Sequence, residues 1–139
     1  MKEGKIKKIL YSKTGELGKL AAHVNKCMDD DDIHRLRVGV KKLRALLRFI
    51  STGNDSKDPE LSHELRDLYY TAGAIRDARL EVKKIHEAKA ELPVYTGRLY
   101  RTIAVNEKRY NRLYSKKIFK NDEKKFKELK LQPMSMAVA

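Results

Sequence analysis

The chain has 139 residues, and its 32 lysines and arginines outnumber its 19 aspartates and glutamates by 13. This length fits a single domain over residues 1–139, and no apolar run approaches the roughly 18 residues of a membrane-spanning helix. The basic amino terminus lacks the apolar core of a signal peptide, and the single Cys27, expected on a packed apolar face, fits a reducing cytoplasm. The basic excess predicts a polyanionic partner: nucleic acid, an acidic membrane surface or a phosphate polymer.

Apolar residues recur at helical spacing rather than alternating, which predicts an all-α protein. A first helix is expected over residues 5–28, and a break near residues 13–15 is an alternative because Gly15 and Gly18 weaken it. The run DDDD at residues 29–32 indicates a helix start, since aspartates cap exposed amide groups and favour the positive end of the helix dipole. A metal or partner site is the other use of these carboxylates, but they lack the glycine and ligand spacing of a calcium loop.

The remaining elements follow from turn-forming residues and apolar spacing. The second helix ends near residue 51, a loop covers 51–59, and a third helix covers 59–91. The segment LPVYTG is expected to end that helix, before a fourth helix over 97–118 and a short charged helix over 121–130. Four amphipathic helices with short connections predict an antiparallel four-helix bundle with a short extra C-terminal helix.

Basic residues in the second helix form a stripe with alternating spacings of three and four. At about 100° per residue, this spacing places them in one narrow row that flanks the apolar seam, whereas a purely solubilising face lies opposite the core. The row spans about 21 Å at 1.5 Å per residue, which suits an extended polyanion better than one phosphate. Its members are His34, Arg37, Lys41, Arg44 and Arg48.

The third helix repeats this offset, one residue after its own seam positions. If the two helices are antiparallel, both rows border one groove between them, and Gly73 either admits a ligand or allows close helix packing. The residues alone leave two interpretations open, an anion groove or a surface whose cations pair with acids on neighbouring helices. The offset positions are Arg66, Tyr69, Gly73, Arg76 and Lys83.

Two segments resemble the motifs of the CHAD domain family, whose helical domains are named for a characteristic histidine. IHRLRVGVKKLRALLRF is similar to the opening motif, with a histidine, an Arg-Val pair three and four residues later, and a basic cluster ending in Leu-Arg. TAGAIRDARLEV is similar to the second landmark and supplies Gly73, Arg76 and Asp77. ELRDL, with Arg66, lies where the family has a comparable arginine, so the resemblance covers residues 30–87.

This resemblance implies a helical bundle that binds inorganic polyphosphate through basic side chains along a groove. The sequence itself carries no phosphate-binding loop, zinc motif or other catalytic pattern, so no catalysis, cofactor or metal is expected. Family members are associated with polyphosphate granules or with triphosphate-hydrolysing domains, so a cytoplasmic location at such granules is expected. An anion-contacting role is favoured for His34 over a general base, and an orienting role for Asp77. The expected polyphosphate-binding residues are His34, Arg37, Lys41, Lys42, Arg44, Arg48, Arg66, Arg76, Arg79 and Lys83.

The chain departs from the family pattern in two ways. Arg79 replaces the second aspartate of the later motif, and the chain holds one bundle where full-length members hold two related by approximate two-fold symmetry. A homodimer that supplies the second bundle is therefore one expectation, and a reduced binding surface is the other. The alternative functions are a basic nucleic-acid-binding protein, which would need exposed base-stacking aromatics, and a structural or protein-interaction bundle whose basic stripes are salt-bridged.

Overall fold

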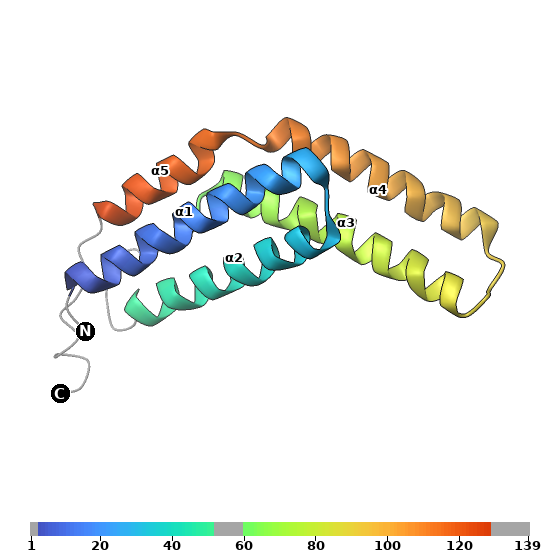
Figure 1. Ribbon diagram of the computed structural model, residues 1–139, viewed down its shortest axis with the longest axis horizontal. Coiled ribbons are helices and arrows are strands. Elements are labelled where there is room, and N and C mark those ends of the chain that lie inside the picture. The colour runs from blue at the N-terminus through green and yellow to red at the C-terminus, as the bar shows by residue number, and fades with distance from the viewer. Residues whose placement is uncertain (1–2, 52–59, 129–139) are drawn as a thin grey trace.

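The computed structural model describes residues 3–51 and 60–128, and within them the chain forms five α-helices and no strand. These helices are α1 (Glu3–Cys27), α2 (Asp30–Ser51), α3 (His63–Glu87), α4 (Pro93–Leu113) and α5 (Lys116–Lys127). The predicted all-α class, with four long helices and a short C-terminal helix, is confirmed (Figure 1). Most of the expected loop at 51–59 and the segment after residue 128 lie outside the described residues.

Successive long helices run in opposite directions. On α1 and α2, His23 contacts Asp32, whereas Leu17, earlier in α1, lies against Gly39, later in α2. The same reversal joins α2 to α3, because Asp30 pairs with Arg79 while the later Arg37 meets the earlier Tyr69. The antiparallel arrangement expected for the second and third helices is therefore confirmed.

The seam of α2 is buried as predicted, at Leu36, Val40, Leu43, Leu47 and Ile50. All five meet apolar side chains of α1 and α3 in one contiguous core. Burying a leucine or valine side chain stabilises a fold by about 1.5–3 kcal/mol. This core therefore fixes which flank of α2 turns toward α3 and which turns toward α1.

The predicted interruptions of the chain were partly wrong. α1 has no break near residue 14, and Gly18 instead allows α5 to pack closely: a Cβ there would lie 3.2 Å from the Cβ of Phe119. The break expected at LPVYTG lies slightly earlier, at residues 88–92, and Pro93 begins α4, since proline at the first helical position sacrifices no hydrogen bond. Ser115 separates α4 from α5 and accepts a hydrogen bond from the amide of Lys117 at 3.2 Å.

The four aspartates start α2, as predicted. The side chain of Asp29 accepts a hydrogen bond from the amide of Asp32 at 3.3 Å, and the next three aspartates form the first helical turn. Two of them also make tertiary contacts, because Asp32 meets His23 on α1 and Asp30 meets Arg79 on α3. Among the described residues, no group of three or more histidine, cysteine, aspartate or glutamate side chains is placed to hold a metal ion.

The expectation that Cys27 is packed was wrong, because its side chain is exposed. Cys27 is the last residue of α1, and Met28 turns the chain away with a positive φ of 50°. Cys27 therefore follows the apolar spacing of α1 but lies beyond the part of the helix that is packed against α2.

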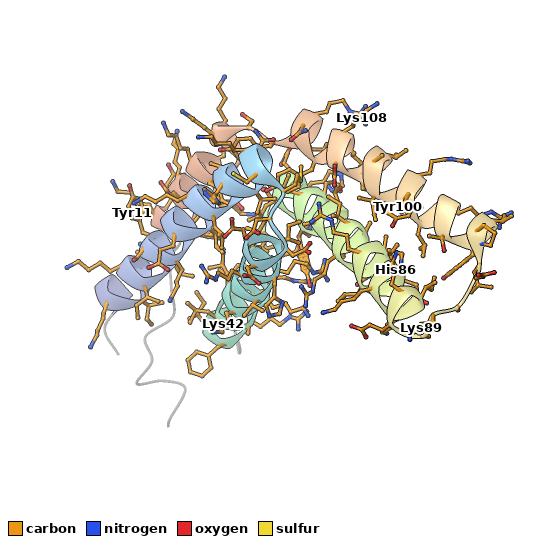
Figure 2. All side chains as sticks on the ribbon, turned by 45° about the vertical axis from the view of Figure 1, so that its right-hand side comes forward. Tyr11, Lys42, His86, Lys89, Tyr100 and Lys108 are labelled. Atoms are coloured by element: carbon orange, nitrogen blue, oxygen red, sulfur yellow. The ribbon has the colours of Figure 1, made fainter. Side chains whose placement is uncertain are left out.

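α4 packs along α3, and the hairpin that they form extends beyond the ends of α1 and α2 (Figure 1). Near the tip of this hairpin, His86 of α3 and the hydroxyl of Tyr100 of α4 lie 3.3 Å apart (Figure 2). None of the helices that the structure describes combines the length and apolar character needed to cross a membrane.

α5 lies antiparallel to α1 and reaches the start of α3 through Asp122. This carboxylate is 1% exposed and accepts a hydrogen bond from the amide of Ser62, the residue that caps α3, at 3.2 Å. Burial raises the pKa of Asp122, an effect partly offset by its hydrogen bonds from Ser62 and the nearby charge of Lys125. The ionised carboxylate therefore lowers the stability of the fold at neutral pH.

This raised pKa predicts how the stability of an Asp122→Asn variant depends on pH. The native state of the wild type binds the Asp122 proton more tightly than the unfolded state does, so this carboxyl group contributes more stability as pH falls through its folded-state pKa. We expect the unfolding free energy of the variant, relative to that of the wild type, to be highest at pH 7 and to decrease in acid. Urea unfolding of both proteins at pH 7 and pH 4 measures the difference, and a variant that gains stability relative to the wild type in acid would contradict the assignment.

Candidate anion-binding site

The centre of the candidate site is Arg37, which α2 extends across to α3. Its Nη1 donates a hydrogen bond to the backbone carbonyl of Tyr69 at 3.0 Å, and its guanidinium carbon lies 4.4 Å from the centroid of the Tyr69 ring. A cation over an aromatic face is attracted by about 0.5–1 kcal/mol at an exposed site and by more when it is desolvated. Arg37 is therefore held in one place by a carbonyl, a ring and the backbone of α3.

Gly73 provides the space that this arginine occupies. A Cβ at residue 73 would lie 1.7 Å from Nη1 of Arg37 and 2.7 Å from its guanidinium carbon. The glycine thus admits a side chain of α2, which differs from both earlier interpretations, a ligand approach and a close backbone contact. Its role in the site is to position Arg37.

The other cations of the α2 row lie along the same flank as Arg37, because spacings of three, four and seven residues return to one side of a helix. On α3, Arg66 and Arg76 are seven residues from Gly73 and Tyr69 respectively, so they share the side that Arg37 reaches. Together these residues define the α2–α3 basic face: His34, Arg37, Lys41, Arg44 and Arg48 of α2, with Arg66 and Arg76 of α3.

Most cations of the α2–α3 basic face lack an acidic partner within the described residues. No ion pair there involves His34, Lys41, Arg44, Arg66 or Arg76, although four ion pairs elsewhere join a histidine or arginine to a carboxylate within 3.3 Å. The Nε of Arg66 is buried without a hydrogen-bond partner in this part of the chain. Like charges that share a surface repel one another, so this face is stabilised when a counter-charge binds to it.

Arg79 is used differently from the arginines of this face. It pairs with Glu107 of α4 at 2.8 Å and with Asp30 of α2 at 2.5 Å, and it donates to the carbonyl of Met28 at 2.8 Å. Burial lowers the pKa of its guanidinium, but hydrogen bonds and charges from Asp30 and Glu107 outweigh this effect and leave it raised. Arg79 therefore ties three helices together, and its charge is already balanced.

Two further expected site residues lie apart from the α2–α3 basic face. Lys42 lines a hollow of about 390 Å³ between α1 and α2, on the flank of α2 that faces away from α3. His34 lines the same hollow, so it lies on the outer ridge of α2 between the two surfaces. Lys83 pairs with Glu87 at 4.0 Å, on the part of α3 beyond the contact of Arg79 with the start of α2.

Sequence reasoning missed the contribution of two adjacent tyrosines. Tyr69 is buried and supports Arg37, whereas Tyr70 is 60% exposed and packs edge-on against Tyr69, with ring centroids 5.4 Å apart. The sequence already places Tyr69 in the offset row of α3 and Tyr70 next to it. Which of the two is buried depends on the angle at which α2 crosses α3, which the sequence does not specify.

The comparison with protein families gives a match over most of the chain. The family model for the CHAD domain matches residues 14–130, a range that covers α2, α3, α4 and α5 and most of α1. No curated protein and no solved structure matched the chain.

Proposed function

The chain belongs to the CHAD domain family, and on that premise we propose that it is a non-catalytic module that binds inorganic polyphosphate on its α2–α3 basic face. The contacts would come from His34, Arg37, Lys41, Arg44, Arg48, Arg66 and Arg76. Lys42 and Lys83 would add charge at the margins. Arg79 would position the helices rather than touch the ligand, because its guanidinium is occupied by two carboxylates.

One observation carries this proposal: His34, Lys41 and Arg44 lie in a row with Arg37 and form no ion pair within the described residues. The alternative of a salt-bridged structural stripe requires acidic partners, which Arg79 and Lys83 have and which His34, Lys41 and Arg44 lack among the described residues. Guanidinium groups match the oxygens of a phosphate in geometry and charge. A linear phosphate polymer carries such oxygens at regular intervals, which matches a regularly spaced row of cations on a helix.

Binding of this kind is electrostatic and multivalent. Each phosphate that the protein neutralises releases counterions, so affinity should fall steeply with salt concentration. Arg37 uses one of its five N–H groups on Tyr69, which leaves the others for ligand oxygens. The proposed ligand would therefore contact several cations at once rather than fill a single pocket.

Competition between polyanions tests the proposal. Labelled long-chain polyphosphate is bound to the protein and displaced by unlabelled polyphosphate, single-stranded RNA or duplex DNA of equal phosphate content, at several salt concentrations. We expect polyphosphate to compete at the lowest concentration at every salt. Stronger competition by a nucleic acid throughout the series would contradict the proposed ligand.

Nucleic acid is the second candidate because the exposed ring of Tyr70 lies one residue from the support of Arg37. Bases stack on exposed aromatic rings, whereas phosphate polymers have no base to stack. A Tyr70→Ala variant should therefore leave polyphosphate binding within about twofold of the wild type. Loss of about 1–3 kcal/mol in RNA binding, the usual value of one stacked base, would favour the second candidate.

A Gly73→Ala variant should lose affinity without losing the fold. The new methyl group would occupy the position of the Arg37 guanidinium, which lies at the end of a flexible side chain and can move away. We expect polyphosphate affinity to fall about tenfold, which corresponds to about 1.4 kcal/mol. Isothermal titration measures the affinity, and urea unfolding measures the stability, which should change by no more than about 1 kcal/mol.

Gly97 in α4 provides the matched control. A Cβ at Gly97 would meet no atom within 4 Å, so a Gly97→Ala variant makes the same chemical change in open space. It should gain up to about 1 kcal/mol of stability from helix propensity and bind polyphosphate like the wild type. Equal affinity of the two glycine variants would show that Arg37 does not act from this position.

We also propose that two copies of the chain pair. The surface favoured for this contact is the α3–α4 hairpin, where six large apolar side chains are more than a third exposed: Leu80, Leu92, Val94, Tyr95, Tyr100 and Val105. Light scattering during gel filtration should then give twice the chain mass of 16.1 kDa.

A further inference from the structure

Lysine and arginine are segregated among the helices. Every arginine of the chain lies between Arg35 and Arg112, on α2, α3 or α4. α1 and α5 each carry six lysines, two acidic residues and no arginine. The chain therefore has two kinds of basic surface, and the α2–α3 basic face accounts for only one of them.

The lysine-bearing helices lie side by side, on the opposite side of the molecule from the α2–α3 basic face. α1 packs against α2 and α5, and α5 reaches α3 through Asp122 and Ser62, so the order around the bundle is α1, α2, α3, α5 (Figure 1). In this order, the edge formed by α1 and α5 is opposite the edge formed by α2 and α3.

Lysines of both helices meet on this outer surface. Lys19, Lys116 and Lys120 line one hollow of about 250 Å³ between α1 and α5, with Tyr114 and Phe119 among its other residues. Lys8, nearer the start of α1, is also exposed. These four lysines define the α1–α5 lysine face: Lys8, Lys19, Lys116 and Lys120.

The α1–α5 lysine face differs from an ordinary solubilising surface, which mixes charges of both signs. None of its four lysines forms an ion pair within the part of the chain that the structure describes. Of the two acids on α5, Asp122 is buried and only Glu123 borders the hollow. The result is a surface on which four lysines are accompanied by the single acid Glu123, and this excess of positive charge is costly unless a polyanion or its field acts on it.

The two basic faces are far enough apart to bind polyanions independently. Two layers of helices, each about 10 Å in diameter, separate them by roughly 20 Å. The Debye length at physiological ionic strength is about 8 Å, so a polyanion on one face barely repels a polyanion on the other. Two segments of polyphosphate can therefore be held at once by one copy of the chain.

We propose that the α1–α5 lysine face is a second polyphosphate-binding surface, so that a single copy of the chain bridges two polyphosphate chains. This inference rests on the proposed function of the α2–α3 basic face. Lysine is a compact and strongly hydrated charge on a flexible stem, so its contacts with phosphate are less geometrically fixed than those of arginine. The lysine face thus holds a second chain loosely, while the arginine-bearing face holds the first chain in register.

A recruitment assay measures bridging directly. Long-chain polyphosphate is fixed to beads and saturated with protein, and the washed beads then receive fluorescently labelled long-chain polyphosphate. The wild type should retain the label. A variant with Lys8, Lys19, Lys116 and Lys120 changed to Gln should still bind the beads through the α2–α3 basic face, but should retain at least tenfold less label.

The matched control removes equal charge from exposed positions of α4, in a variant with Arg98, Arg101, Lys108 and Arg112 changed to Gln. This control should recruit label like the wild type, because neither basic face is altered. Equal retention of label by the lysine variant and the control would overturn the inference, even if the lysine variant bound the labelled polyphosphate more slowly. Equal retention is also the result expected if two paired copies, each with its own α2–α3 basic face, joined the polyphosphate chains, and it would favour pairing over bridging by one copy.

The outcomes also separate this inference from the proposed function on which it rests. A wild type that binds the beads but recruits no label would overturn bridging and leave polyphosphate binding by the α2–α3 basic face in place. A wild type that fails to bind the beads would overturn both. Loss of bead binding in the lysine variant alone would assign the primary site to the α1–α5 lysine face.

Discussion

An Arg37→Glu, Arg44→Glu double variant should bind long-chain polyphosphate at least 100-fold more weakly than the wild type. The first substitution removes the guanidinium that Tyr69 holds over Gly73, and the second removes its neighbour two helical turns along α2. A hydrogen bond to a charged group contributes about 1.5–3 kcal/mol, so two such losses exceed the 2.7 kcal/mol or so that a 100-fold change requires. The two new carboxylates add repulsion of the ligand.

Fluorescence anisotropy with labelled polyphosphate, over a range of salt, measures this loss. An Arg98→Glu, Arg101→Glu variant makes the same change in net charge on exposed positions of α4, and its affinity should fall by less than about threefold. A Lys41→Glu, Arg44→Glu variant leaves the support of Arg37 intact and should weaken binding in the same direction. If the α4 variant lost as much as the first, the net charge of the chain rather than the α2–α3 basic face would govern binding.

Replacing Tyr110 by alanine should produce the largest loss of stability. Of the residues of α4, all of which the structure describes, only Tyr110 is buried, and its hydroxyl donates a hydrogen bond to the carbonyl of Ala21 in α1 at 2.9 Å. Burial raises the pKa of this hydroxyl, with a smaller contribution from Tyr114, so it remains a donor at all physiological pH values. Truncating a buried aromatic side chain costs about 3–5 kcal/mol of unfolding free energy.

Urea unfolding followed by circular dichroism measures this cost. A Tyr110→Phe variant keeps the ring and removes only the hydroxyl, so it should lose about 1 kcal/mol, the usual net value of one hydrogen bond. Hydrogen exchange in the Ala variant should accelerate most in α4, because its other side chains are partly or fully exposed. An Ala variant as stable as the Phe variant would mean that α4 does not depend on this anchor.

The sequence predicted the core of α2 and α3 well, because leucine, isoleucine and valine at spacings of three and four have one consistent explanation. It predicted the boundaries of α4 poorly, since Pro93 either ends or begins a helix and the pattern alone does not distinguish the two uses. The sequence could have shown that Lys42 lies on a different flank of α2 from Lys41, because adjacent residues are about 100° apart around a helix. The family motif had grouped it with Lys41.

The contacts that define the site could not be predicted in the same way. Arg79 meets one acid 49 residues away and another 28 residues away, so its charge is balanced by partners that no local spacing reveals. The pairing of Gly73 with Arg37 likewise depends on the depth at which α2 settles against α3. In both cases, the positions were singled out correctly as unusual, but the physical reason lies on a neighbouring helix.

The support of Arg37 has a consequence for how affinity is distributed over the face. A free arginine or lysine side chain loses up to about 2 kcal/mol of rotamer entropy when it is immobilised. Arg37 has already lost much of this freedom on folding, because the carbonyl and ring of Tyr69 fix it before any ligand arrives. Exposed Lys41 must lose it on binding. A phosphate placed at Arg37 should therefore bind more tightly than one placed at Lys41, and a short oligophosphate should first occupy the part of the α2 row around Arg37.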